Sequence, residues 1–142
     1  MDISRRTFCQ LGAGAAALAL APALPAFAST DPVQEAILAF TGGAAPAEGD
    51  IELTTPEIAE NGNTVPVAVS ADGAVAILLL AAGNPNPGVA TFTFGKLAPH
   101  RSAATRIRLA QTQDVIAVAK LESGAFTMVQ RTVKVTIGGC GG

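Results

Sequence analysis

The residue with the most evident chemistry is Cys140, which stands between two pairs of glycines in the run VKVTIGGCGG. Cysteines are often buried because the thiol behaves as a small hydrophobe, but the glycines beside Cys140 offer it no apolar cover. Its sequence neighbours also provide no helix N-terminus and no cation, the features that stabilise a thiolate. The carboxylate of Gly142 raises the expected pKa of the thiol slightly above its ordinary value of about 8.5. These features predict a thiol that is offered to another molecule, not a catalytic cysteine.

The flanking glycines predict a thin arm around this thiol, made of Gly138, Gly139, Gly141 and Gly142. Glycine has no side chain and reaches backbone conformations that are closed to other residues. From Ile137 to Cys140 the chain spans at most about 10 Å, at roughly 3.3–3.6 Å per residue. Residues 138–142 are therefore interpreted as a flexible C-terminal arm that can carry Cys140 into a narrow channel.

The first 28 residues predict an export signal. An arginine pair in SRRTF (residues 4–8) precedes an Ala/Leu/Gly-rich stretch, and AFA (residues 26–28) is a cleavage motif. The arginine pair resembles a twin-arginine signal, with an ordinary Sec signal as the alternative. Pro22 and Pro25 interrupt the apolar stretch, which is shorter than the about 20 residues of a membrane-spanning helix. A periplasmic protein without a membrane anchor after cleavage is expected.

Removal of residues 1–28 changes the cysteine content and the charge. Cys9 is lost, so Cys140 becomes the single cysteine of the mature chain and no internal disulfide can form. An unpaired thiol in an oxidising compartment is capped, dimerised or oxidised unless it is used. About 110 residues remain, which is one domain. The formal net charge becomes one unit more negative than the −2 of the whole chain, which argues against nucleic acid as a partner.

Other reactive arrangements find little support in the sequence. His100 is the one histidine, and a lone loop histidine is usually solvated. A hydrolase needs a nucleophile, a base and an orienting acid, and nothing fixes His100 beside Cys140. Neither a second histidine nor a second mature cysteine is available for a metal site, and no Gly-rich phosphate loop joins a strand to a helix. No catalytic residue, metal site or cofactor is assigned, and the chain is not expected to be an enzyme.

The mature chain predicts one helix followed by strands. Asp31 and Pro32 suit the cap and the first helical position, and Val33, Ile37 and Phe40 fall on one helical face. Seven strand-like runs follow, separated by turn signals; they occupy residues 51–55, 64–71, 74–82, 89–94, 104–110, 114–121 and 126–137. The pattern predicts an all-β protein, an immunoglobulin-like antiparallel β-sandwich with one N-terminal helix, over residues 29–137.

Pro66, the loop of residues 83–88 and the apolar strands each support a further expectation. Pro66 predicts an edge or a bulge in the second run. The loop GNPNPG (residues 83–88) is interpreted as a plain turn. The apolar strands need more cover than one helix supplies, so a protein partner on one sheet face is expected.

Together these stretches resemble the SoxY family, the sulfur-carrier subunits of the periplasmic thiosulfate-oxidation system. The resemblance rests on IELTTPEIAENGNTVPV (51–67), GNPNPGVATFTF (83–94), RIRLAQTQDVIAVAKLESG (106–124) and VKVTIGGCGG (133–142). It implies that Cys140 carries sulfur intermediates covalently, so that the protein is a substrate of other enzymes and not a catalyst.

The resemblance also implies a set of partners. A SoxZ-like β-sandwich protein would form a heterodimer with this chain. A c-type cytochrome would couple thiosulfate to Cys140, a sulfate-releasing hydrolase would act next, and a molybdenum sulfur dehydrogenase would oxidise the remaining sulfur. The hairpin expected at residues 71–82 is shorter than in typical members of the family, which leaves its partner contacts open.

Two functions of other classes stay open on the sequence alone. An exported structural or adhesin-like β-sandwich could join two chains by a disulfide through Cys140. A periplasmic metal carrier could use Cys140, His100 and Met128.

Overall fold

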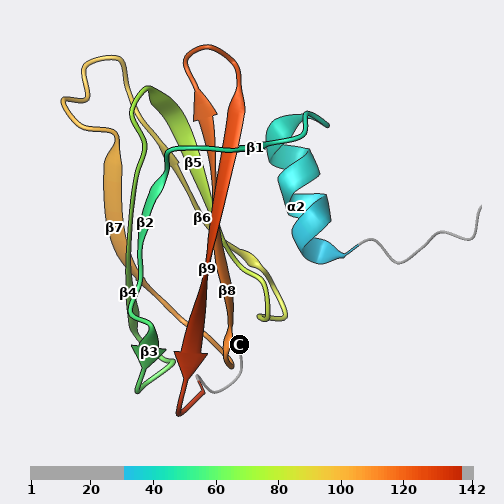
Figure 1. Cartoon of the computed structure of the whole chain (residues 1–142), viewed down its shortest axis with the longest axis vertical. Coiled ribbons are helices and arrows are strands. Elements are labelled where there is room, and N and C mark those ends of the chain that lie inside the picture. The colour runs from blue at the N-terminus through green and yellow to red at the C-terminus, as the bar shows by residue number, and fades with distance from the viewer. Residues whose placement is uncertain (1–30, 139–142) are drawn as a thin grey trace, which may run out of the picture.

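The computed structural model describes residues 31–138 of the chain. Two β-sheets pack face to face, and one helix lies on the outer side of the larger sheet (Figure 1). This architecture confirms the predicted β-sandwich with an N-terminal helix. The predicted leader and arm residues 139–142 lie outside the described residues. No helix between residues 31 and 138 is both long enough and apolar enough to cross a membrane.

The helix, α2 (Pro32–Thr41), begins and ends as its sequence predicts. The Asp31 carboxylate accepts a hydrogen bond of 3.0 Å from the backbone N–H of Val33, which satisfies one of the free donors of the first turn. Gly42 adopts the left-handed conformation, with φ of 67°, that glycine tolerates best. Val33 and Ile37 are buried against the sheet.

Within residues 31–138, nine strands follow the helix in two sheets. They are β1 (Ala47–Glu48), β2 (Glu52–Thr54), β3 (Ile58–Ala59), β4 (Val65–Ser70), β5 (Ala74–Ala81), β6 (Gly88–Thr93), β7 (Ser102–Ile107), β8 (Gln113–Leu121) and β9 (Phe126–Val135). The larger sheet has the order β1-β9-β8-β5-β6, with β3 also paired to β9, and the smaller has the order β2-β4-β7. All seven predicted strands are present, as β2 and β4 to β9.

The two short strands β1 and β3 were not predicted, and both pair parallel to β9. Two-residue strands have no periodicity to recognise, and their partner lies far along the chain. They cover the two ends of the free edge of β9, at Thr127–Met128 and at Lys134–Val135. The covered edge leaves fewer unpaired backbone groups for association with another strand.

Two apolar cores explain why β5 and β8 lack the usual alternation of apolar and polar residues. Ile77, Leu79 and Ala81 of β5 point into the core between the sheets. Leu78 and Leu80 point the other way, into a second core beneath α2 that also contains Ile116 and Val118 of β8. A strand buried on both faces is expected to be continuously apolar. The apolar strands had suggested an external partner on one sheet face. In β5 and β8 these apolar residues are covered by other parts of this chain.

Removing part of the inner core should destabilise the fold strongly. Leu79 is fully buried, and Leu79→Ala is expected to lower the free energy of unfolding by about 2–5 kcal/mol, because it removes apolar contacts and leaves a cavity. The same substitution at Leu97, which is 96% exposed, should change it by less than about 0.5 kcal/mol. Chemical denaturation of the two variants measures the difference, and equal stabilities would contradict this assignment of the core.

Three local expectations need correction. Residues 71–82 are not a hairpin, because β4 and β5 belong to different sheets and the turn between them is a crossover. Pro66 lies in the central strand of the smaller sheet, although its only strand neighbour there is β7, since β2 pairs with residues 68–70 of β4. The strand β9 ends at Val135, and Ile137 beyond it is 67% exposed.

Candidate functional site

The chain leaves β9 through a short segment, residues 136–138, that we call the arm root. The end of β3 and the loop between β3 and β4 hold it on one side. The backbone N–H of Thr136 donates to the Ala59 carbonyl at 3.1 Å, and the Thr136 hydroxyl lies 3.0 Å from the Glu60 carbonyl. The backbone N–H of Gly62 donates to the Ile137 carbonyl at 2.7 Å. These bonds fix the path of the backbone up to Ile137.

The loop between β7 and β8 holds the end of β9, directly before the arm root. The Thr112 hydroxyl accepts a hydrogen bond of 2.9 Å from the backbone N–H of Val135, which extends the β8–β9 pairing by a side chain. The two loops are also tied to each other, because the Leu109 N–H donates to the Gly62 carbonyl at 2.7 Å. Leu109 is fully buried, so this junction rests on the core.

Gly138 is the one residue of the predicted arm that the structure describes, and it lies against Ala110. A β-carbon added at Gly138 would collide with the Ala110 carbonyl oxygen and lie 3.3 Å from the carbonyl carbon. Glycine is thus required here for a close approach between two backbones. Cys140 is two residue steps beyond Gly138, so the sulfur-bearing residue lies within about 7 Å of this contact along the chain.

The predicted site residues Cys140, Gly139, Gly141 and Gly142 lie outside the described residues. Their assignment as the attachment site and carrier arm stays a prediction. What the structure adds is the anchored segment from which they continue.

His100 is far from the arm root. It lies in the loop before β7, whereas Ala110 follows the end of β7 (Figure 1). The five residue steps from Ser102 to Ile107 span about 17 Å in an extended strand, which exceeds the reach of Cys140 from Gly138. Met128 packs instead beside the core under α2. His100 and Met128, the two described residues of the metal-carrier alternative, therefore belong to different parts of the sandwich.

Charged side chains within residues 31–138 form no obvious reactive cluster. No group of three or more His, Cys, Asp or Glu in this range could hold a metal ion. The one salt bridge found there joins Arg101 to Glu122 at 3.1 Å, and the Glu122 side chain is largely exposed. An exposed pair of this kind contributes at most about 1 kcal/mol.

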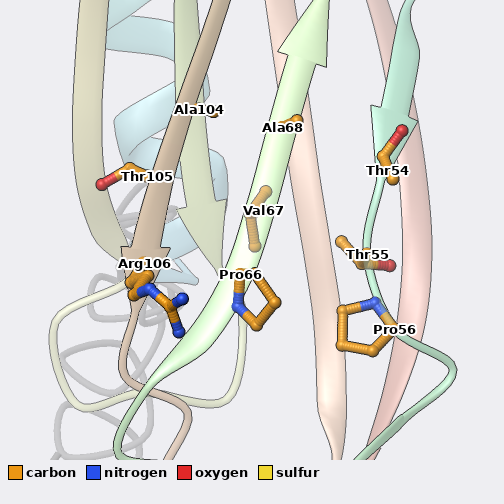
Figure 2. A pocket seen from close by; sticks show the side chains of 9 residues that line it. All are labelled: Thr54, Thr55, Pro56, Pro66, Val67, Ala68, Ala104, Thr105 and Arg106. Atoms are coloured by element: carbon orange, nitrogen blue, oxygen red, sulfur yellow. The ribbon is translucent and has the colours of Figure 1, made fainter.

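A groove of about 610 Å³ runs along the outer face of the smaller sheet. Its floor is made mostly of small side chains from β4 and β7, among them Ala68 and Ala104. In Figure 2 the side chain of Arg106 lies on one side of Pro66 and the ring of Pro56 on the other. Pro56 precedes β3, whose Ala59 binds Thr136, so the groove leads toward the end of the sandwich that holds the arm root.

Sequence reasoning missed the residues that hold the arm root. Gly62, Ala110 and Thr112 belong to loops with no reactive residue type, and they act mainly through backbone groups. The loop of residues 83–88 also contacts this region through Asn84, so it is more than a plain turn. Pairings between loops that are more than twenty residues apart leave no local pattern in a single sequence.

The family comparison covers the region just described. Residues 37–140 match the family model "Sulfur oxidation protein SoxY", and the match includes Cys140. The solved structure of the sulfur carrier protein SoxY from Chlorobium limicola f. thiosulfatophilum is similar to this chain, with 33% sequence identity and a TM-score of 0.64. That similarity covers 77% of this chain and 100% of the Chlorobium chain. No curated protein sequence matches the chain.

A more distant likeness concerns the fold alone. The superoxide reductase (neelaredoxin) from Ignicoccus hospitalis is 16% identical with a TM-score of 0.54, over 61% of this chain and 80% of its own. By contrast, the SoxY match spans most of the chain, both sheets and the segment that ends in the glycine-flanked cysteine. The chain belongs to the SoxY family of sulfur oxidation proteins.

Proposed function

We propose that this protein is a periplasmic sulfur carrier that holds thiosulfate-derived intermediates covalently on Cys140. The observation that carries the proposal is the SoxY match through Cys140, at the end of a chain whose last described residues are anchored between two loops. The protein would reach the periplasm by the twin-arginine pathway. Its thiol would be a substrate for other enzymes, and the sandwich would be the scaffold that presents it.

The proposed chemistry can be written as two balanced steps. First the Cys140 thiol and thiosulfate (S₂O₃²⁻) join through a new sulfur–sulfur bond, with one proton released to water and two electrons passed to a c-type cytochrome. The product is a cysteine S-thiosulfonate. A hydrolase then adds water across the bond to the sulfonate group, which releases sulfate and a proton and leaves a persulfide on Cys140. A molybdenum sulfur dehydrogenase would oxidise the remaining sulfur.

Intact mass measurement of the mature protein from thiosulfate-grown cells tests the attachment. We expect the C-terminal peptide to carry thiosulfonate and persulfide adducts that a thiol reductant removes. A plain disulfide dimer without these adducts would favour a structural, adhesin-like role, and a bound metal ion would favour a metal carrier. Either result would contradict the carrier proposal.

The family implies a complex between SoxY and SoxZ, and we propose that a SoxZ-like β-sandwich protein forms a heterodimer with this chain. The outer face of the larger sheet is occupied by α2, whereas the described residues leave the outer face of β2-β4-β7 open. Small side chains, such as those of Ala68 and Ala104, line the groove on that face. A sheet of another protein could pack closely against this face and extend to the end of the sandwich that holds the arm root.

Placing a charge on this face should disrupt the heterodimer. Ala104 is exposed in the middle of β7, and Ala104→Glu is expected to weaken the complex by roughly 100-fold, about 3 kcal/mol, because it buries an unpaired carboxylate. Copurification and calorimetric titration with the partner measure the effect. The matched control is Ala125→Glu in the exposed β8–β9 turn, which should bind normally. Equal affinity of the two variants would rule out this face.

A further inference from the structure

A buried side-chain amide connects the loop of residues 83–88 to the β7–β8 loop. Gln113 is 7% exposed, one of two buried polar residues among those described. Its carbonyl oxygen accepts from the Gly83 N–H at 2.7 Å, and its NH₂ group donates to Asn84 Oδ1 at 2.9 Å and to the Gln111 carbonyl at 3.1 Å. A buried amide with these partners is satisfied, and losing one of them would be costly.

Asn84 pairs with the β7–β8 loop as a strand neighbour would. Its Nδ2 donates to the Arg108 carbonyl at 2.7 Å, and its Oδ1 accepts from the Ala110 N–H at 3.0 Å. The side chain therefore binds one carbonyl and one N–H on either side of Leu109, which fixes the orientation of that backbone segment. Gln113 holds Asn84 in place through the bond to Oδ1.

The segment fixed by Asn84 is the one that receives the arm root. The Ala110 N–H is bound by Asn84, and its carbonyl oxygen faces Gly138. Leu109, between the two bonds of Asn84, is tied through Gly62 to Ile137. A continuous set of directed contacts thus runs from Gln113 through Asn84 and Ala110 to Gly138.

We propose that Asn84 and Gln113 are positioning residues for the carrier arm. They hold the Ala110 carbonyl against Gly138 and so set the direction in which the chain leaves the sandwich toward Cys140. This inference rests on the proposed function, because it concerns how an enzyme meets the loaded thiol. Because Cys140 lies only about 7 Å beyond Gly138 along the chain, we expect a shift of about 1 Å at the root to move the thiol by a similar amount. Misplacement of this size can cost up to about 100-fold in rate.

Variants on both sides of the contact between Ala110 and Gly138 test the proposal. Asn84→Ala removes the bonds to Arg108 and Ala110, and Gly138→Ala forces the arm root away from Ala110. Both should lower kcat for oxidative loading with thiosulfate by about 10-fold or more. KM should stay unchanged, since the docking surface is untouched. Alkylation of Cys140 by iodoacetamide should also stay near the wild-type rate. The control Asn86→Ala, at an exposed position of the same loop, should load normally.

A distance measurement separates this proposal from the proposed function. Nitroxide labels on Cys140 and on Leu97→Cys, at the far end of the sandwich, report where the arm points without any enzyme present. Asn84→Ala should shift or broaden the distance distribution relative to the wild type. An unchanged distribution, or a normal kcat in both Asn84→Ala and Gly138→Ala, would overturn the positioning role. Failure of the wild type to load would instead refute the carrier function, while the distances would still decide the direction of the arm.

Discussion

Replacing Cys140 by serine should abolish sulfur loading completely while leaving the folded protein intact. The hydroxyl of serine cannot form the sulfur–sulfur bond on which the proposed intermediates depend. Among the described residues, both apolar cores are built from residues between Val33 and Val135, and we expect the substitution to leave them intact. The thermal midpoint should therefore change little, as for substitutions outside the packed structure. Mass spectrometry after incubation with thiosulfate and the oxidising enzymes measures the loss.

A second variant distinguishes the position of the thiol from its mere presence. Cys140→Ser combined with Ser123→Cys restores one exposed thiol, but in the β8–β9 turn instead of on the arm. We expect this protein to react with iodoacetamide and still to acquire no sulfur enzymatically. Loading of the relocated thiol would mean that the enzymes accept any exposed cysteine, and the arm would lose its proposed purpose.

The sandwich could be predicted because its determinants are local. Asp31 and Gly42 mark the ends of α2, and turn signals such as Asp72-Gly73 separate strands whose apolar patterns are strong. What a single sequence does not contain is the assignment of strands to sheets. The turn at Asp72-Gly73 is compatible with a hairpin, yet it carries the chain from one sheet to the other.

The thiol of the candidate site could also be predicted, because a glycine-flanked cysteine after a strand is a local pattern. Its support could not be predicted, since it depends on contacts between distant loops. Asn84 lies 24 and 26 positions from the two residues whose backbones it binds, and Thr136 lies 76 positions from Glu60. Neither asparagine nor threonine carries chemistry that singles it out in advance. The physical role of Gly138 likewise becomes visible only when Ala110 is placed beside it.

Two glycines of the arm test whether it must be thin. Gly139→Val and Gly141→Val keep the thiol but add a β-branched side chain, which stiffens the backbone and widens the chain on either side of Cys140. We expect loading by the cytochrome to be about 10-fold slower or more, because a narrow channel would no longer admit the thiol in the reactive geometry. The loss should appear in the enzymatic rate alone, with thermal stability and alkylation by a small reagent near the wild-type values.

The matched control for these two arm variants is Gly95→Val. It makes the same substitution at an exposed site, where an added β-carbon meets no atom within 4 Å. That control should load normally. It should also match the arm variants in thermal stability and in alkylation rate. Slow loading with normal alkylation assigns the defect to entry into the enzyme, since the thiol itself is equally reactive. If Gly139→Val and Gly141→Val both load at the wild-type rate, the glycines do not serve passage through a channel, and the thin-arm interpretation of GGCGG is wrong.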